Sequence, residues 1–187
     1  MNAPLSNCER GDETWLLGRL RRGDEEAFDV VYDRYRPRVF SFLCRLSADR
    51  FLAEDLVQET FLRLANKARD LHPTTNLRAW LFTVARNLCV DQRRHVHRGL
   101  GYLHELSLLP RRTPRSPSER AELSESVTRL EQALRSLSET HREVLLLCGV
   151  EDFTPAEAAE VLDLAPATLR KRLSRARVKL KEALDVR

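Results

Sequence analysis

The sequence contains no segment that would place the chain in a membrane or direct it to secretion. None of its apolar runs approaches the roughly 20 residues that a membrane-spanning helix needs. The N-terminal stretch MNAPLSNCERGDETW has no basic segment followed by an apolar one, which is the pattern of a signal peptide. We therefore expect a cytoplasmic protein that does not insert into a membrane.

Cysteine is scarce, and its spacing excludes the common cysteine-based sites. The four cysteines, at positions 8, 44, 89 and 148, include no CxxC pair, so neither a disulfide framework nor a zinc ribbon is expected. His95 and His97 lie near Cys89 but lack a fourth ligand at metal-binding spacing. No Ser/His/Asp set, carboxylate pair or glycine-rich phosphate loop has supporting context. The sequence thus predicts no metal, no cofactor and no enzymatic activity.

Glycine and aromatic side chains are nearly absent from the C-terminal part of the chain. No glycine follows Gly149, and Phe153 is the single aromatic residue between positions 118 and 187. A core with one aromatic ring must be aliphatic and small, which is consistent with a compact module of four helices. Hydrophobic residues (42%) and charged residues (32%) are in the ordinary range for a helical protein of one domain or two small ones.

Two closely spaced helix starts are the most informative feature of this C-terminal part. Thr154 opens a capping box that ends at Glu157, with Pro155 at the first helical position. Pro166 marks a second start after a short turn. From there an apolar stripe recurs at helical spacing, at Leu169, Leu173, Ala176 and Leu180. A short helix, a turn and a longer helix describe a helix-turn-helix.

The longer of these helices is strongly basic, although the chain as a whole is not. From Pro166 to Arg187, eight lysines and arginines oppose two acidic residues, which gives a net charge of +6. The whole chain carries +4, so residues 1–165 sum to −2. A basic terminal helix is often only a solvated face. The tandem helix starts favour the alternative, in which this helix contacts DNA phosphates.

The remaining helices follow from apolar periodicity and from capping residues. A short helix at 12–22, anchored by Trp15 and Leu16, should end at Gly23. A longer helix should begin at Asp24 and break or restart at Pro37. Further helices are predicted at 54–68, 77–96, 117–136 (core stripe Leu123, Val127, Leu130 and Leu134) and 139–148 (Ser138 as cap, Gly149 as end).

Two of these helices carry distinctive outer faces. On helix 54–68, Leu62 interrupts a polar face, either as an ordinary exposed leucine or as part of a docking stripe for another protein. Around helix 77–96, five arginines between positions 78 and 98 oppose one aspartate, which makes a second basic surface. Three prolines among arginines and serines near positions 110–117 then indicate an extended linker. We therefore predict an all-α fold with domains at 1–98 and 118–187, joined by a linker at 99–117.

Taken together, these segments resemble the extracytoplasmic-function family of bacterial RNA polymerase sigma factors. Four blocks carry the resemblance: GDEEAFDVVYDRYRPRVF (23–40), AEDLVQETFLRL (53–64), LRAWLFTVARNLCVDQRR (77–94) and residues 137–184. The resemblance implies a first domain for core polymerase and the downstream promoter element, and a second for the upstream element. It also implies as partners core RNA polymerase (its β′ clamp and β subunit), promoter DNA and an anti-sigma factor.

The resemblance further implies which residues make these contacts. The surface that grips the β′ clamp would comprise Asp55, Gln58, Glu59 and Leu62. The downstream element, including a base flipped into the loop at 70–76, would meet Thr74, Thr75, Asn76, Arg78, Arg86, Asn87, Arg93 and Arg94. The upstream element would meet Thr168, Arg170, Lys171, Ser174 and Arg175.

Two departures and two alternatives accompany this interpretation. Asp163 and Ala167 stand where the family usually has glycine, although aspartate tolerates left-handed backbone angles. The linker lacks the acidic segment of primary sigma factors. A two-domain helix-turn-helix regulator acting without polymerase is the main alternative, and a protein-interaction module such as a sigma-factor inhibitor is the other.

Overall fold

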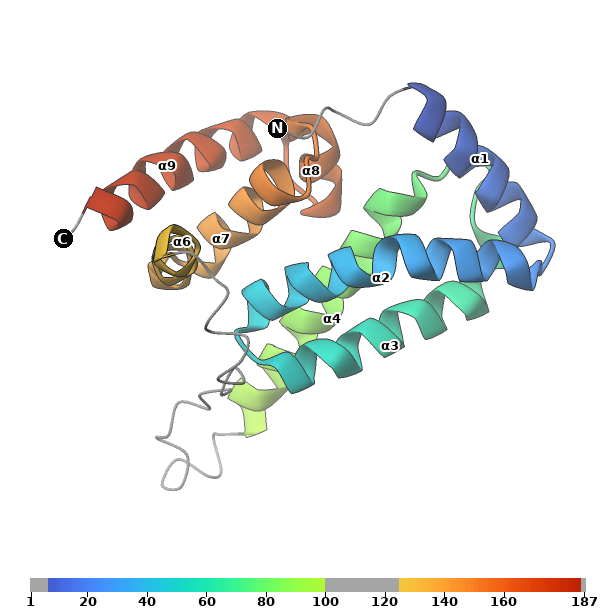
Figure 1. The fold of residues 1–187 in the computed structure, drawn as a ribbon, viewed down its shortest axis with the longest axis horizontal. Coiled ribbons are helices and arrows are strands. Elements are labelled where there is room, and N and C mark those ends of the chain that lie inside the picture. The colour runs from blue at the N-terminus through green and yellow to red at the C-terminus, as the bar shows by residue number, and fades with distance from the viewer. Residues whose placement is uncertain (1–6, 100–124, 186–187) are drawn as a thin grey trace.

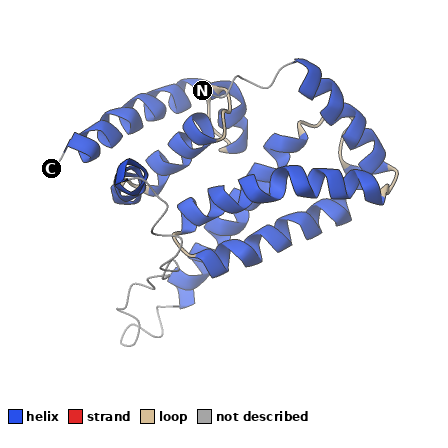
Figure 2. Cartoon of the chain, in the orientation of Figure 1, coloured by secondary structure: helices blue, strands red, loops and turns tan. Residues whose placement is uncertain are grey.

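The computed structural model describes residues 7–99 and 125–185, and the regular structure in both ranges is helical, with no strand (Figure 2). The N-terminal half, 7–99, holds α1 (Asn7–Arg21), α2 (Glu25–Ser47), α3 (Arg50–Lys67), a 3₁₀ turn η1 (Ala68–Asp70) and α4 (Leu77–Gly99). The C-terminal half, 125–185, holds α6 (Glu125–Ser136), α7 (Glu139–Leu145), a π-helical turn η3 (Leu146–Val150), α8 (Pro155–Val161) and α9 (Pro166–Asp185). The all-α prediction is confirmed. The predicted linker at 99–117 lies outside the described residues apart from Gly99, as does the predicted start of helix 117–136.

In the N-terminal half, α2, α3 and α4 pack on one another and α1 packs against α2 (Figure 1). Local capping sets where the long helices begin. The Asp24 carboxylate accepts a hydrogen bond from the Ala27 N–H at 3.2 Å, and the Asp49 carboxylate accepts one from the Leu52 N–H at 3.1 Å. Gly23 closes the connection from α1 with φ at 78°, as its position predicted.

Two predictions about this half are wrong. Helix α2 runs without a break through Pro37. The proline ring removes one intrahelical hydrogen bond, but Tyr35 and Val39 on either side are fully packed in the core and hold the helix together. Trp15 does not anchor α1: its side chain is 56% exposed and lies under the Arg19 guanidinium, 4.9 Å from the ring centre. Leu16 does anchor the helix, because its side chain is buried.

The C-terminal half forms the predicted helix-turn-helix. The capping box at Thr154 is present, since the Thr154 hydroxyl accepts from the Glu157 N–H and the Glu157 carboxylate accepts from the Thr154 N–H. Asp163 takes the left-handed backbone angle of the turn, with φ at 52°. An aspartate can therefore replace the glycine that is usual in the family at this point.

Three finer expectations for this half are wrong. Gly149 does not end a helix, because the chain continues through η3 and turns at Asp152 with φ at 54°. Ser138 stands at the N-cap of α7, but its hydroxyl contacts His141 Nδ1 instead of a backbone N–H. Val127 and Leu130 are 37% and 40% exposed, because α6 is buried mainly through its last turn.

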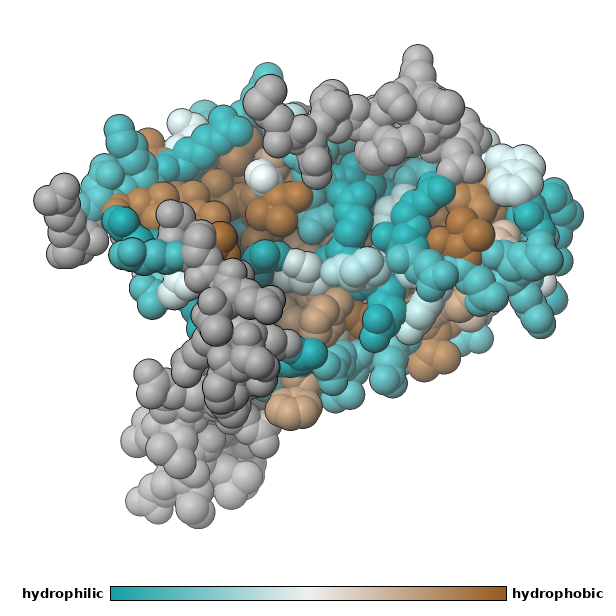
Figure 3. Space-filling model, viewed as in Figure 1, coloured by the Kyte–Doolittle hydropathy of each residue, from teal (hydrophilic) through white to brown (hydrophobic). Residues whose placement is uncertain are grey.

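On the face shown in Figure 3, hydrophobic residues form a band between α9 and helices α6 and α7.

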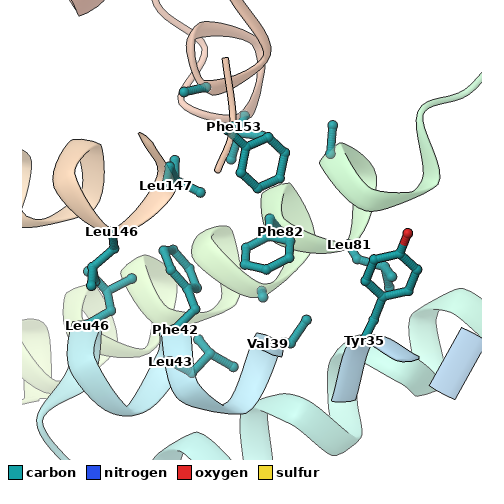
Figure 4. Close-up of a cluster of buried hydrophobic side chains, with 14 of the residues drawn as sticks. Tyr35, Val39, Phe42, Leu43, Leu46, Leu81, Phe82, Leu146, Leu147 and Phe153 are labelled. Carbon is teal, nitrogen blue, oxygen red and sulfur yellow. The ribbon is translucent and has the colours of Figure 1, made fainter. Parts of the chain in front are cut away.

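The two halves share one hydrophobic core, which the sequence did not reveal. Phe82 of α4 packs edge-to-face on Phe42 of α2, with 5.3 Å between ring centres. On its other side Phe82 meets Phe153 of the C-terminal half, with 5.2 Å between ring centres (Figure 4). Leu46 and Leu146 lie near each other beside these rings (Figure 4). The packing of the C-terminal half on the N-terminal half through these contacts is called the closed arrangement below.

Candidate polymerase and promoter interfaces

The outer face of α3 has the mixed polar and apolar character that the sequence predicted. Asp55 and Gln58 are exposed, and Leu62 is 58% exposed. Glu59 is partly exposed and pairs with Arg63 at 2.9 Å. The opposite side of α3 is buried against α2 and α4, through Leu56, Val57, Thr60, Phe61 and Leu64. The core thus fixes which side of α3 remains free for a partner.

Phe51 extends this face by one turn and was not among the residues predicted for it. Its side chain is 72% exposed, the largest value among the exposed large hydrophobic residues of the described ranges. Phe51 precedes Leu62 by eleven residues, close to three helical turns, so the two lie on the same side of α3. Asp55 and Gln58 lie between them on that side. The eleven-residue spacing was visible in the sequence, but the helix start was expected at residue 54.

The loop before α4 is a tight turn held by its own polar groups. The Thr75 N–H donates to the His72 carbonyl at 2.9 Å, and the Thr74 hydroxyl lies 2.8 Å from His72 Nδ1. The Asn76 side-chain oxygen accepts from the Ala79 N–H at 2.9 Å and so caps α4. Thr74 and Asn76 are exposed, whereas Thr75 is partly buried. Asn76 therefore stabilises the start of α4, and Thr74 has the side chain that is most accessible to a ligand.

The C-terminal half covers three of the arginines predicted to meet downstream DNA. Arg86 pairs with Glu143 through contacts of 3.0 and 3.5 Å. Arg93 pairs with Glu139 and also donates to the Leu46 carbonyl at the end of α2. Arg78 is only 3% exposed. The ionic contacts join α4 of the first half to α7 of the second.

Two neighbouring predicted DNA contacts remain accessible. Arg94 is exposed and has a long contact of 3.7 Å with Asp91. Asn87 is exposed and accepts from Arg86 at 3.2 Å. The eight residues predicted for the downstream element are thus divided between an accessible group and a group that the closed arrangement covers.

Arg78 is in an unusual environment. Its guanidinium carbon lies 3.9 Å from the centre of the Phe153 ring, in a cation–π contact. Burial lowers the pKa of Arg78, and the nearby positive charge of Arg38 lowers it further. Two of its guanidinium nitrogens, Nε and Nη2, are buried and have no hydrogen-bond partner within the described residues. A buried cation with unsatisfied donors destabilises the arrangement that buries it.

Helix α9 has the orientation that its periodicity predicted. Leu169, Leu173 and Ala176 are buried. The exposed residues on the other side include all five predicted upstream contacts, Thr168, Arg170, Lys171, Ser174 and Arg175. The positive charge of α9 also acts on the neighbouring helix α7: burial lowers the pKa of His141, and the charges of Lys179, Arg172 and Arg175 on α9 act in the same direction. The outer side of α9 is therefore a positively charged surface in water.

Two kinds of structural feature do not occur in the described residues. No group of three or more histidine, cysteine or acidic side chains is arranged to hold a metal ion in residues 7–99 and 125–185. In the same ranges no helix is both long enough and apolar enough to span a membrane.

Comparison with known proteins agrees with this arrangement of helices. Residues 31–99 match the family model of Sigma-70 region 2, and residues 128–180 match that of Sigma-70 region 4. The chain is 33% identical to the RNA polymerase sigma factor CarQ of Myxococcus xanthus over 171 residues, covering 90% of this chain and 95% of CarQ. It is 30% identical to the ECF RNA polymerase sigma factor SigM of Bacillus subtilis, covering 82% and 92% of the two chains. The chain belongs to the extracytoplasmic-function (ECF) family of RNA polymerase sigma factors.

Solved structures support the same assignment for this sigma factor. The sigma factor RpoE of Bartonella quintana, in complex with the anti-sigma factor NepR, is 31% identical, with a TM-score of 0.72 over 85% of this chain and 97% of RpoE. CnrH, in complex with the cytosolic domain of CnrY, is 25% identical, with a TM-score of 0.71 over 92% and 96% of the two chains. The family resemblance seen in the sequence is thus confirmed. As a sigma factor, the chain has core RNA polymerase and promoter DNA as partners, and the regulator without polymerase is not favoured.

Proposed function

We propose that this sigma factor divides promoter recognition between its two halves. Residues 118–187 bind the duplex upstream element, and residues 1–98 bind core polymerase and the melted downstream element, with 99–117 as the connection. The observation that carries the proposal is the orientation of α9. Its apolar stripe is buried and its basic side faces solvent, which is how a recognition helix presents itself to the major groove.

The N-terminal half supplies two further surfaces. The exposed side of α3, from Asp55 to Leu62, docks on the polymerase β′ clamp. The turn at 72–76 lies at the start of α4, where Thr74 can hydrogen-bond the edge of an extruded base. The arginines of α4 then hold the phosphates of the single strand without reading its sequence.

The chain itself performs no catalysis under this proposal, since RNA synthesis belongs to the polymerase. It acts in the cytoplasm, where polymerase and promoters are found. We also infer an anti-sigma factor as a regulatory partner. RpoE, one of the similar structures, is bound to an anti-sigma factor, and its chain aligns with most of this one.

Substitutions on opposite sides of α9 test the role of this helix. Lys171→Ala or Arg175→Ala should weaken binding to upstream duplex DNA, and loss of one phosphate contact should flatten the slope of log K against log salt by about one unit. Leu173→Ala should instead lower the free energy of unfolding by roughly 2–5 kcal/mol, because its side chain is buried. DNA binding across a salt series and urea denaturation measure the two effects. A Leu173→Ala protein of normal stability, or unchanged DNA binding by the basic-residue variants, would contradict the assignment.

A further inference from the structure

Three arginines of the N-terminal half each pair with a glutamate of the C-terminal half. Arg38 of α2 donates to the Glu151 carboxylate at 3.0 Å and to its carbonyl at 3.1 Å. Arg86 and Arg93, both on α4, pair with Glu143 and Glu139 of α7. Arg86 and Arg93 are two turns apart on α4, and Glu139 and Glu143 are about one turn apart on α7. With the pair of Arg38 and Glu151, these contacts set a row of cations against a row of carboxylates across the interface. These are called the arginine row (Arg38, Arg86, Arg93) and the glutamate row (Glu139, Glu143, Glu151).

The two rows differ in how deeply they are buried. The side chains of Glu143 and Glu151 are 2% and 5% exposed, and Arg38, Arg86 and Arg93 keep 24–31% of their side-chain surface. Glu139, at the edge of the interface, is 39% exposed. Taking a carboxylate out of water costs about as much as its ion pair returns. The ion pairs of the glutamate row therefore fix the register of the two halves at a high desolvation cost, and removing one carboxylate leaves its arginine without that partner in the interface and favours opening.

Arg78 makes the closed arrangement less favourable still. Its guanidinium lies over the Phe153 ring and is repelled by the positive charge of Arg38, and two of its buried nitrogens have no hydrogen-bond partner in the described ranges. An anionic ligand on the opened N-terminal half could give hydrogen-bond acceptors to this cation as well as to the arginine row. The apolar contact of Phe82 with Phe153 stabilises the closed arrangement. The arginines around this contact favour opening when an anionic ligand is present to bind them.

We propose that the arginine row is a phosphate-binding surface with two alternative occupants: the glutamate row in the free chain, and the backbone of the melted promoter strand after the halves separate. The proposal rests on the proposed function of the N-terminal half and adds two elements to it. First, Arg38 on α2 contacts a phosphate of the strand in addition to Arg86 and Arg93 on α4. The carboxylates of the second half become direct competitors of the strand that the first half must bind.

A quantitative consequence follows from this competition. If the strand binds only the open chain, its apparent affinity equals its affinity for the open chain multiplied by the fraction of chain that is open. Weakening the glutamate row should raise that fraction and hence the affinity, without any change in the surface that binds DNA.

The test uses the full chain and two variants with the same change of charge. Glu139→Gln with Glu143→Gln removes two carboxylates of the glutamate row and preserves their shape. Glu125→Gln with Glu160→Gln is the control, because both residues are exposed on the C-terminal half. The probe is a fluorescein-labelled oligo(dT) strand, and binding is followed by anisotropy. We expect the row variant to bind on the order of tenfold more tightly than the control, and its radius of gyration in X-ray scattering to increase.

Further variants separate the possible outcomes. Adding Arg38→Ala or Arg86→Ala to the row variant should remove the gain in affinity, because the strand then lacks its phosphate contact. Equal affinity of the row variant and its control, or a gain that survives loss of the arginines, overturns the proposal. Thermal melting verifies that the row variant is folded, and a single-site variant, Glu143→Gln, replaces it if it is not. Failure of the proposed function would appear separately, as normal promoter melting by polymerase that carries the Arg86→Ala sigma factor.

Discussion

At the scale of single residues, the interface between the halves shows how burial changes the chemistry of a charged group. Burial raises the pKa of Glu151, whereas its ion pair with Arg38 acts in the opposite direction and is outweighed. Arg78 shows the corresponding effect for a cation, since burial lowers its pKa. Both side chains would recover water on opening, so the free energy of the closed arrangement depends on the protonation of this cluster.

Glu151→Gln should reveal this dependence as a function of pH. A carboxyl whose pKa is raised in the folded state stabilises that state fully below its unfolded pKa, and this contribution is lost as pH rises through the folded pKa. Glutamine does not titrate. The unfolding free energy of the wild type relative to Glu151→Gln should therefore fall as pH rises from the ordinary pKa of a glutamate through the higher pKa of the folded state.

Urea denaturation of both proteins across this range measures the difference. A relative stability that rises with pH would mean that attraction by Arg38 and its neighbours Arg78 and Arg45 outweighs burial. That result would reverse our account of the cluster.

Thr74 and Asn76 are close in sequence but should respond differently to substitution. Asn76→Ala removes the cap of α4 and should cost about 1 kcal/mol of stability. Thr74→Ala should leave stability within about 0.5 kcal/mol, because Thr74 is exposed. It should instead change which base is preferred at one downstream position. A fluorescent base analogue reports promoter melting for all four bases at each position. If Thr74→Ala lowers melting equally for every base, or has no effect, base recognition lies elsewhere.

At the scale of elements, α3 fills the core with one side and leaves the other in solvent, where we propose that polymerase docks. Its inner side holds α2 and α4 together, and its outer side carries Phe51 and Leu62 around polar residues. Large apolar side chains at the two ends of a polar stripe are suited to anchor a docked helix, because buried apolar contacts dominate the energy of most interfaces.

Leu62→Asp and Phe51→Asp should each weaken binding to core polymerase by about tenfold or more, which is the effect of losing an interface anchor. Neither should lower thermal stability appreciably, because both side chains are exposed. Val30→Asp is the matched control, since Val30 is 44% exposed on α2. Polymerase affinity and thermal melting are measured together. Normal affinity in a folded Leu62→Asp protein would remove α3 from the interface, and a defect in Val30→Asp of equal size would show that the effect is not specific.

At the scale of the whole molecule, the two halves present different surfaces in the closed arrangement. The basic side of α9 and the outer side of α3 remain exposed, but the arginine row is covered. Such a chain could meet polymerase and upstream DNA while its downstream surface is still occupied. Under the proposal above, the closed arrangement imposes an order on the contacts, with separation of the halves preceding capture of the melted strand.

The sequence by itself determined the helices, most of their caps and the orientation of their faces. Asp24, Gly23, Thr154 and the stripe from Leu169 to Ala176 act through local hydrogen bonds and through the helical period, and both can be recognised in a short stretch. The same holds for the exposed side of α3 and the basic side of α9. Family membership also followed from short blocks of sequence and was confirmed by comparison.

Only the tertiary structure decided which surfaces are covered. The sequence placed Arg78, Arg86 and Arg93 on a basic surface and gave no sign that Phe82 would pack between two halves of the chain. Packing of the C-terminal half buried Phe82, nearly buried Arg78, and paired the other two with glutamates about 50 residues further along the chain. Contacts between residues this far apart leave no periodic signal in either segment, because they depend on how two finished surfaces fit. Pro37 remained helical for the same reason, since packing on both sides of it outweighed its local preference.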